Sequence, residues 1–213
     1  MTAGGGRVIV LNGGSSSGKT TIGRGLQATL AGVWVLLGVD GLLWALPPAL
    51  LSAPAGVSIR HGVIELGPGF RAVHAAFRRS VVAYAEAGVG VVLDEVWLDG
   101  AADQRRWSDT LGPVDVCWVG VRCPADVAAA RETDRGDRPA GVARAQADAV
   151  HAGAHYDVEV DTARLDEPAA TAVVAAWVAE RWSVPGRPAG GAETRPPRGA
   201  WSAGGVGRPP WER

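Results

Sequence analysis

A phosphate-binding motif near the start of the chain constrains its fold more than any other feature. Residues 13–20 read GGSSSGKT, a complete match to G-x-x-x-x-G-K-[ST]. An apolar run over residues 8–11 precedes the motif, and Ile22, Leu26 and Leu30 follow it at helical spacing. A strand, a glycine-rich turn and a helix in this order predict the first unit of a parallel α/β sheet.

The lysine of this motif, Lys19, is the one lysine of the chain, beside twenty arginines. An ammonium is a compact point charge that fits between the β- and γ-phosphates of a nucleotide, where a planar guanidinium would not. Arginine therefore serves at every other cationic position of the chain, and lysine occurs at the one position in the motif where arginine could not serve. The pattern predicts a nucleoside triphosphate site, and the alternative is a chance glycine-rich turn.

The motif also predicts which residues hold the nucleotide, taken here as ATP. Backbone N–H groups of the turn can wrap the phosphates, and the N-terminus of the next helix adds its positive dipole. Thr20 is placed to offer its hydroxyl to Mg²⁺. The expected nucleotide-binding residues are Gly13, Gly14, Ser15, Ser16, Ser17, Gly18, Lys19, Thr20 and Thr21.

Along the rest of the chain, short β-rich runs alternate with longer helical patterns, which is typical of a parallel sheet with crossover helices. We expect a P-loop kinase-like three-layer α/β sandwich, with a five-stranded parallel sheet and helices on both faces. An apolar stripe from Phe70 to Tyr84 predicts a helix, and residues 57–66 predict a small hairpin. The expected strands are residues 8–11, 33–37, 89–93, 114–121 and 158–160.

Carboxylates follow two of the predicted strands. Asp40 comes after the second strand, at the sheet edge that faces the ligand crevice, so it could accept a proton from a substrate hydroxyl. The alternative is that Asp40 caps the helix that begins near Gly41. Asp94 ends the third strand as a Walker B aspartate would, with Glu95 as a second carboxylate at the Mg²⁺ site. Their alternative is to cap a helix near Gly100.

The densest run of charge, RETDRGDR at residues 131–138, lies between two predicted helices. Its arginines could close over the transferring phosphoryl group as a lid near residues 131–141. The alternative is a solvated turn held by its own ion pairs.

His151 and His155 have the spacing of a helical metal site, but Gly153 separates them and no third ligand is evident, so we attribute the spacing to chance.

Composition bounds the remaining possibilities. With 213 residues, 47% of them hydrophobic, the chain suits one domain with a sizeable core over residues 1–182. Residues 183–213 contain thirteen glycines and prolines and predict a mobile tail. A net charge of −1 argues against nucleic acid as a partner, and no apolar run reaches the roughly 20 residues of a membrane helix. Two cysteines without a disulfide or metal pattern suit the cytoplasm, and the oligomeric state stays open, a homo-oligomer included.

Taken together, these segments resemble one family, the chloramphenicol phosphotransferases of antibiotic-producing actinomycetes, within the P-loop kinase-like group. The resemblance extends from about residue 7 to residue 182. Its most particular parts are the charged run at 131–138 and the segment YDVEVDT at 156–162. Further matching segments are residues 9–16 with 18–19, then 38–40 and 118–123.

This resemblance implies ATP-dependent phosphorylation of the primary 3-hydroxyl of chloramphenicol, which would inactivate the drug. It implies that Asp40 is the general base. It also implies that the charged run forms a lid over ATP, in which Arg131 belongs to the nucleotide site and Arg135 and Arg138 neutralise the transferring phosphate.

The departures from the family pattern concern the acceptor. Gly41 stands where the family has serine, Glu95 where a second aspartate is usual, and Trp97 where phenylalanine is. The resemblance therefore supports kinase chemistry more directly than it identifies the small-molecule acceptor.

One alternative is a P-loop kinase of a primary metabolite, such as a sugar acid, a shikimate-like molecule or a nucleoside. Another is a non-catalytic nucleotide-binding regulatory module, although such a module has no use for a base at Asp40.

Overall fold

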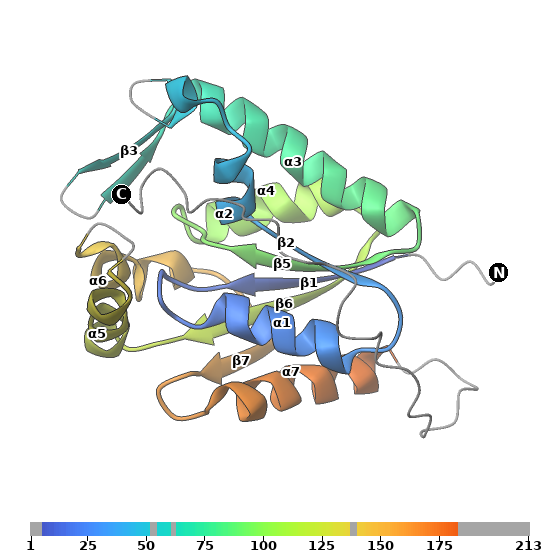
Figure 1. The fold of residues 1–213 in the computed structure, drawn as a ribbon. Helices are drawn as coiled ribbons and strands as arrows, with labels where there is room; N and C mark the ends of the chain where they lie inside the picture. The colour runs from blue at the N-terminus through green and yellow to red at the C-terminus, as the bar shows by residue number, and fades with distance from the viewer. Residues whose placement is uncertain (1–5, 52–54, 61–62, 137–139, 183–213) are drawn as a thin grey trace, which may run out of the picture.

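The computed structural model describes residues 6–51, 55–60, 63–136 and 140–182. A five-stranded parallel sheet with the strand order β2-β5-β1-β6-β7 forms its centre, and helices cover both faces (Figure 1). The elements in chain order are β1 (Arg7–Asn12), α1 (Lys19–Thr29), β2 (Trp34–Gly38), α2 (Val39–Trp44), η1 (Pro48–Leu50), β3 (Val57–Arg60), β4 (Val63–Leu66), α3 (Pro68–Glu86), β5 (Gly90–Glu95), α4 (Ala101–Leu111), β6 (Asp115–Arg122), α5 (Ala125–Arg135), α6 (Val142–Gln146), η2 (Ala149–His151), β7 (Val158–Asp161) and α7 (Glu167–Arg181).

All five predicted strands are present, each within two residues of its expected ends, so the three-layer α/β sandwich is confirmed. The predicted hairpin is the antiparallel pair β3–β4, with Val57 opposite Leu66, and its turn at residues 61–62 lies outside the described residues. The predicted helix is α3, although Tyr84 at the end of its stripe is 39% exposed. The expected tail at 183–213 also lies outside the described residues.

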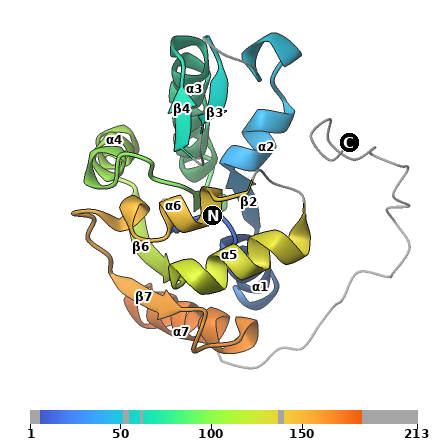
Figure 2. The same ribbon diagram turned by 90° about the vertical axis from the view of Figure 1, so that its left-hand side faces the viewer.

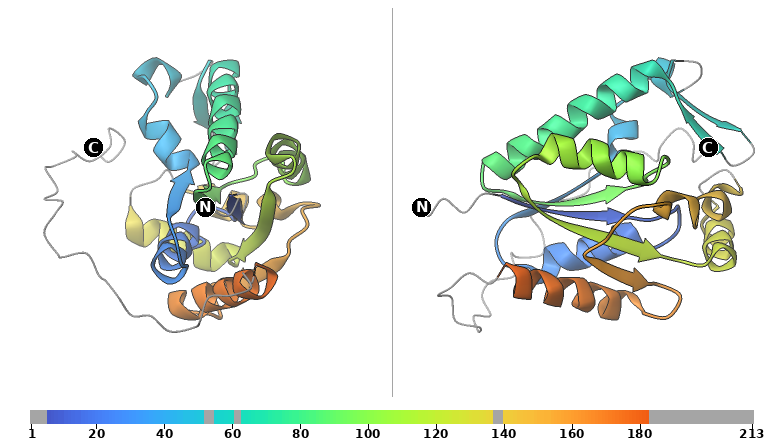
Figure 3. Two further views of the ribbon diagram at one scale, coloured as in Figure 1. Left: turned by 90° about the vertical axis from the view of Figure 1, so that its right-hand side faces the viewer. Right: turned by 180° about the vertical axis from the view of Figure 1, so that it is seen from behind.

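The sheet separates two apolar cores, because successive side chains of a strand point to opposite faces. On β1, Ile9 and Leu11 pack in the core that includes Ile22 of α1 and Val174 of α7. Val8 and Val10 pack in the other core, with residues of α3 and α4. Figure 3 shows the two helical layers on either side of the sheet. Burial on both faces explains why the strands are continuous apolar runs.

The remaining elements gather beyond the carboxyl ends of the strands. Helices α5 and α6 lie in front of this edge, and α2 and the β3–β4 hairpin stand beside them (Figure 2). Ligands of open α/β sheets bind outside this edge, so these elements surround the expected site.

Among the described helices, none combines the length and the apolar character needed to cross a bilayer.

Candidate active site

The phosphate-binding motif forms the turn between β1 and α1. Gly18 caps α1 with a left-handed backbone (φ 93°), a conformation that favours glycine, and Ser16 is also left-handed (φ 59°). Residues 15–21 line a cavity of about 230 Å³ together with Gly38, Asp40, Asp94 and Arg135. The hydroxyls of Ser15, Ser16 and Ser17 are buried and have no hydrogen-bond partner in the described structure. Such unpartnered groups suit a polar ligand such as phosphate.

The two leading glycines of the motif do not line this cavity but lie against the structure beneath it. A Cβ on Gly13 would come within 2.5 Å of the carbonyl oxygen of Val121, and a Cβ on Gly14 within 3.2 Å of the Cβ of Gln146. These two residues therefore allow the turn to approach β6 and α6 closely. Gly13 and Gly14 therefore shape the turn but do not line the phosphate cavity, so any part they take in nucleotide binding is indirect.

Lys19 is buried and spans the turn from inside. Its Nζ donates a hydrogen bond to the carbonyl oxygen of Gly14 at 2.8 Å and lies 3.7 Å from Oδ1 of Asp94. The ammonium is thereby held at the floor of the phosphate cavity, next to the end of β5. This is the position that the motif predicts for a charge that reaches the β- and γ-phosphates.

Thr20 and Asp94 come together at the same cavity. Thr20 Oγ1 donates a hydrogen bond to Asp94 Oδ2 at 2.5 Å. A hydroxyl and a carboxylate are oxygen ligands of the kind that Mg²⁺ prefers, and Mg²⁺ usually takes its remaining ligands from water and phosphates. The described residues contain no group of three or more His, Cys, Asp or Glu side chains that could hold a metal. The pair therefore fits Mg²⁺ that arrives with a nucleotide.

Asp40 is the second residue of α2, and α2 begins directly after β2. The end of the strand and the start of the helix therefore place Asp40 at the edge of the sheet. The N-cap of α2 is Gly38, and therefore Asp40 does not cap this helix as the alternative required. Asp40 lines the phosphate cavity and also a second cavity of about 690 Å³. Among the described residues, Val39 and Val96 are the two others that line both cavities.

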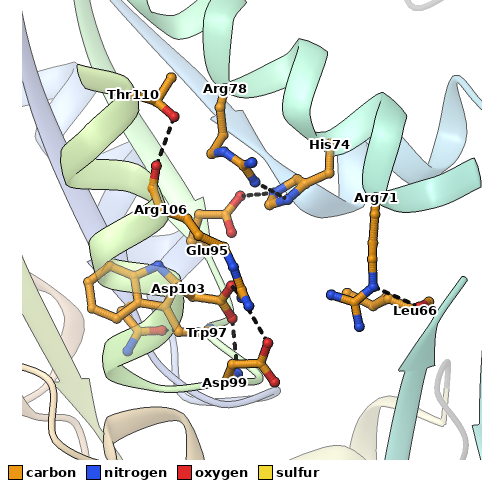
Figure 4. A network of polar contacts seen from close by, with 11 residues as sticks. Leu66, Arg71, His74, Arg78, Glu95, Trp97, Asp99, Asp103, Arg106 and Thr110 are labelled. Atoms are coloured by element: carbon orange, nitrogen blue, oxygen red, sulfur yellow. Dashed lines mark hydrogen bonds and ion pairs between the residues drawn. The ribbon is translucent and has the colours of Figure 1, made fainter. Parts of the chain in front are cut away.

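The larger cavity, hereafter the acceptor cavity, has one apolar and one polar wall. The apolar wall comes mainly from α2, the hairpin and the start of α3, and includes Leu43, Leu51, Val57, Ile64, Leu66 and Phe70. The polar wall comes from α3, the end of β5 and α4 (Figure 4), and includes His74, Arg78, Glu95, Asp99, Asp103 and Arg106. A mixed cavity of this size suits a drug-sized molecule with both apolar and polar parts.

Glu95 belongs to the acceptor cavity, which corrects the expectation that it adds a second carboxylate at the Mg²⁺ site. Neighbouring residues of a strand point to opposite faces, so with Asp94 turned toward Thr20, Glu95 turns toward α3. The strand alternation could have predicted this. Glu95 is buried, and its desolvation raises the pKa of its carboxyl group, partly offset by a hydrogen bond to His74.

His74 links Glu95 to Arg78 in a chain of polar contacts (Figure 4). Arg78 Nη1 lies 3.0 Å from His74 Nδ1, and His74 Nε2 lies 3.4 Å from Glu95 Oε1. A guanidinium can only donate, so Nδ1 accepts, and in the neutral ring Nε2 carries the hydrogen toward Glu95. The imidazole stacks on Phe70 and Phe77 at centroid distances of 5.8 and 6.0 Å, which fixes its orientation.

Beside this chain, Arg106 holds two carboxylates of the polar wall. Its Nη1 lies 2.7 Å from Asp99 Oδ2 and 2.5 Å from Asp103 Oδ1. Each charge on this wall is therefore close to a group of opposite sign or to His74. The wall offers many hydrogen-bond donors and acceptors without a large excess of one charge.

Of the charged run at 131–138, the structure describes residues 131–136, and these are only partly a solvated turn. Arg131 donates to the hydroxyl and the carbonyl oxygen of Thr162 at 3.0 and 2.7 Å, and the Thr162 hydroxyl donates to the carbonyl oxygen of Ser17. Arg131 thus supports the phosphate-binding turn from outside the cavity. Arg135, at the end of α5, lines the phosphate cavity. Arg138 lies outside the described residues.

Glu132, in the same run, is buried and ties α5 to α6. Its two carboxylate oxygens accept hydrogen bonds from the backbone N–H groups of Gly141 and Ala143 at 2.7 and 2.8 Å. A carboxylate at a helix N-terminus satisfies N–H groups that have no partner within the helix. The start of α6 is therefore fixed to α5 by this one side chain.

Beneath the phosphate-binding turn lie Asn12 and Tyr156, to which the sequence analysis assigned no role of their own. Asn12 accepts a hydrogen bond from the N–H of Trp97 and donates to the carbonyl oxygen of Val150 and to the hydroxyl of Tyr156. The Tyr156 hydroxyl lies 2.7 Å from Nδ1 of His151. The partners of Asn12 lie 85 to 144 residues away in the sequence, so no local pattern points to them.

His151 and His155 do not form a site together. His151 is buried, and desolvation is the main cause that lowers its pKa to about 4, whereas His155 is exposed. His151 therefore stays neutral at physiological pH and serves as a polar core residue. This agrees with attributing the four-residue spacing to chance.

Comparisons with known proteins agree with this geometry. Residues 6–182 match the family of chloramphenicol phosphotransferase-like proteins. A protein of Mycobacterium tuberculosis (strain H37Rv) named "Putative O-phosphotransferase" is 36% identical over 176 residues, which cover 74% of this chain and 75% of that protein.

Two solved structures show the same fold. The tunicamycin resistance protein of Deinococcus radiodurans has a TM-score of 0.60 at 17% identity and covers 81% of this chain and 95% of its own. Shikimate kinase of Acinetobacter baumannii, in complex with shikimate, has a TM-score of 0.57 at 17% identity and covers 82% of this chain and 94% of its own. The fold, the phosphate-binding turn and the family match support a P-loop O-phosphotransferase that uses a nucleotide. The chain belongs to the chloramphenicol phosphotransferase-like family.

Proposed function

We propose that the protein is an ATP-dependent O-phosphotransferase that phosphorylates a hydroxyl of chloramphenicol or a related small molecule and so inactivates an antibiotic. The observation that carries this proposal is that Asp40 lines both the phosphate cavity and the acceptor cavity. A carboxylate between a bound nucleotide and a hydroxylated acceptor is placed to act as a general base.

On the donor side, the backbone N–H groups of residues 15–21 bind the phosphates, and Lys19 neutralises charge between the β- and γ-phosphates. Thr20 and Asp94, which are joined by a hydrogen bond, would hold Mg²⁺. When bound, Mg²⁺ stabilises negative charge that develops on the phosphate oxygens. Asp94 also lies near the ammonium of Lys19, so it orients both positive charges of the donor site.

On the acceptor side, Asp40 accepts the proton of the attacking hydroxyl, whose oxygen forms a bond to the γ-phosphorus while the bond to the β–γ bridging oxygen breaks. ADP leaves with that bridging oxygen. Arg135 and Arg138 neutralise charge on the transferring phosphoryl group, and Arg131 completes the nucleotide site. In this proposal residues 131–141 form a lid, which excludes water when both substrates are present.

The same proposal covers the organisation of the chain. The kinase domain comprises residues 1–182, and residues 183–213 form an appended tail rich in glycine, proline and arginine. The protein acts in the cytoplasm without nucleic acid or membrane as a partner.

The polar wall of the acceptor cavity favours a second candidate, a kinase of a polar primary metabolite such as a sugar acid, a shikimate-like molecule or a nucleoside. Six charged or titratable side chains on one wall are more than an apolar acceptor would need. The apolar wall opposite them favours the first candidate.

Mass spectrometry of candidate acceptors after incubation with the protein, ATP and Mg²⁺ distinguishes the candidates. We expect chloramphenicol to gain one phosphate. If shikimate, gluconate or adenosine gains it instead, the second candidate is correct. ATP binding without phosphorylation of any acceptor would favour a non-catalytic nucleotide-binding module.

The role of Asp40 is tested with Asp40→Asn. We expect ATP affinity within about twofold of wild type and phosphoryl transfer reduced by roughly a hundredfold to ten-thousandfold, because the general base is lost. Asp126→Asn is a matched control, since Asp126 is an exposed aspartate in the first turn of α5. Near-normal turnover of the Asp40→Asn variant would remove Asp40 from the mechanism.

A further inference from the structure

Among the described residues that line the acceptor cavity, two polar side chains are buried, Glu95 at the end of β5 and Gln146 at the end of α6. The Oε1 atom of Gln146 accepts a hydrogen bond from the backbone N–H of Ser15 at 2.8 Å, so this oxygen is bonded to the phosphate-binding turn. Glu95 is 2% exposed and is therefore the buried charged group of the cavity. Water screens a buried carboxylate less than an exposed one, so its interaction with a ligand is stronger.

The two carboxylate oxygens of Glu95 differ in their partners. Oε1 lies 3.4 Å from Nε2 of His74, which carries the hydrogen of the neutral ring because Arg78 donates to Nδ1. Oε2 has no hydrogen-bond partner among the residues that the structure describes. Because a buried carboxylate oxygen without a partner costs free energy, Oε2 is placed to accept a hydrogen bond from a ligand.

The orientation of this carboxylate is fixed from the side of α3 (Figure 4). The imidazole of His74 stacks between Phe70 and Phe77, and its Nδ1 is held by Arg78. Oε1 of Glu95 therefore has a partner whose position is set by packing, and Oε2 is the oxygen left for a ligand. A hydrogen-bond acceptor that is already ordered loses little conformational entropy when a ligand binds.

The charges around the cavity favour a neutral or positive group beside Glu95. Five carboxylates and three guanidinium groups of the described residues line the cavity, an excess of negative charge. Two of the guanidinium groups have partners on the polar wall, since Arg106 binds two aspartates and Arg78 donates to His74. An anionic group of an acceptor would therefore meet repulsion at the buried end of this wall.

The third guanidinium group, that of Arg71, is the one that could attract an anion. Its Nε donates a hydrogen bond to the carbonyl oxygen of Leu66 at 3.0 Å, and Figure 4 shows it beside the hairpin, away from Glu95. The side chain is exposed, so water screens its charge. Arg71 therefore offers an acid less than the buried Glu95 takes away.

We propose that Glu95 is a specificity-determining residue whose Oε2 accepts a hydrogen bond from a second donor group of the acceptor, a hydroxyl, an amide N–H or an ammonium. Asp40 meets the hydroxyl that is phosphorylated, and Glu95 binds a group elsewhere on the same molecule. The acceptor is then a neutral or cationic molecule with an apolar part and a further hydrogen-bond donor, and sugar acids and shikimate-like acids are excluded. This inference rests on the proposed function and narrows its acceptor class.

Matched pairs of neutral and anionic acceptors test the exclusion of acids. The pairs are chloramphenicol with the analogue that carries succinyl in place of dichloroacetyl, methyl shikimate with shikimate, and gluconamide with gluconate. ADP release is measured with ATP and Mg²⁺, and adenosine is added as a further neutral acceptor. In every pair that wild type phosphorylates, we expect kcat/KM to be at least about tenfold higher for the neutral member. Equal values, or a preference for the anionic member, would overturn the inference.

Glu95→Gln tests the hydrogen bond itself. The amide oxygen stays opposite the Nε2–H of His74, so the amide NH₂ takes the place of Oε2 and presents a donor to the cavity. With the neutral acceptor that wild type phosphorylates best, we expect KM to rise about tenfold or more while kcat changes less than about threefold, because Asp40 is kept. The KM of the anionic member of the pair should fall, since an NH₂ group can donate to a carboxylate.

A loss for one acceptor together with a gain for its partner cannot come from general damage to the cavity. Glu86→Gln is the matched control, an exposed exchange of the same kind at the end of α3, and should leave both KM values within about twofold of wild type. If Glu95→Gln leaves the KM of the neutral acceptor unchanged while transfer proceeds, only this inference fails. If wild type binds ATP but phosphorylates no acceptor, the proposed function fails and this inference with it.

Discussion

Thr20 Oγ1 lies 2.5 Å from Asp94 Oδ2, although 74 residues separate the two in the sequence. Thr20 is at the first turn of α1 and Asp94 is near the end of β5, and the parallel pairing of β5 with β1 brings the two elements to the same sheet edge. In the proposed function, this hydroxyl and this carboxylate would supply oxygen ligands to a Mg²⁺ ion that a nucleotide brings with it. The pairing of strands thus creates a donor site that neither segment contains alone.

Replacement of Asp94 by asparagine should remove most of the activity, because the amide is a weaker ligand for Mg²⁺ and no longer balances the Lys19 ammonium. We expect phosphoryl transfer to fall on the order of a hundredfold or more, with a shift of the Mg²⁺ titration to higher concentration. Asp109→Asn, at an exposed position of α4, should leave both unchanged. A normal Mg²⁺ titration of the Asp94→Asn variant would exclude Asp94 as a ligand.

Replacement of Lys19 by arginine should abolish transfer although the charge is kept. Lys19 is buried between the Gly14 carbonyl and Asp94, and the wider planar guanidinium cannot take its place without displacing the turn. We expect a loss of at least about a hundredfold in kcat/KM for ATP. The reverse exchange Arg24→Lys, on the exposed side of α1, is the control and should be neutral. Activity of the Lys19→Arg variant near the wild-type level would contradict the point-charge explanation.

Replacement of Glu95 by glutamine should increase stability at higher pH. Burial raises the pKa of Glu95, so as pH increases past the ordinary pKa of a glutamate, the unfolded chain loses its proton before the folded protein does. Wild-type stability therefore falls with rising pH in that window, and glutamine, which keeps the acceptor for His74, avoids the loss. We expect the Tm of Glu95→Gln to exceed that of wild type by more at pH 8 than at pH 4.

Glu86→Gln provides the comparison for this measurement, because Glu86 is exposed at the end of α3. We expect the Tm difference from wild type to change more with pH for Glu95→Gln than for Glu86→Gln. If the Tm difference of the Glu95→Gln variant does not change with pH, Glu95 is not a destabilising buried carboxyl group.

His151 should make the protein sensitive to acid. Its pKa is lowered to about 4 from an ordinary value of 6.5, so between these values the unfolded chain binds a proton that the folded protein excludes. Stability is then lost as pH falls from 6.5 toward 4, and His151→Gln should remove this part of the loss. When Tm is measured from pH 7.5 down to 4.5, the Tm of His151→Gln minus the Tm of wild type should increase by several degrees.

His155→Gln is the control, since His155 is exposed four residues away. We expect the acid profile to change more for His151→Gln than for His155→Gln. A His151→Gln profile parallel to that of wild type would show that the buried imidazole does not contribute to acid sensitivity.

Much of the fold could be predicted because its signals are local. The strands are buried on both faces and so appear as apolar runs, and the phosphate-binding turn needs glycine and serine at fixed spacing. The placement of Glu95 was wrong because adjacency in the sequence was taken as adjacency at the site, whereas strand alternation turns neighbours apart. Arg131 contacts Thr162 beneath the phosphate-binding turn, a pairing that a charged run cannot reveal.

Residues 13–20 by themselves determined that this chain has a phosphate-binding turn between a strand and a helix, because a tight anion-binding loop allows few residue types at few positions. Only the tertiary structure decided that Asp40 lies between two cavities, that Glu95 faces the acceptor cavity and that Gln146 holds Ser15. The physical reason is that these relationships depend on which strand pairs with which and on where α6 lies. Contacts between distant segments leave no periodicity or spacing along the chain.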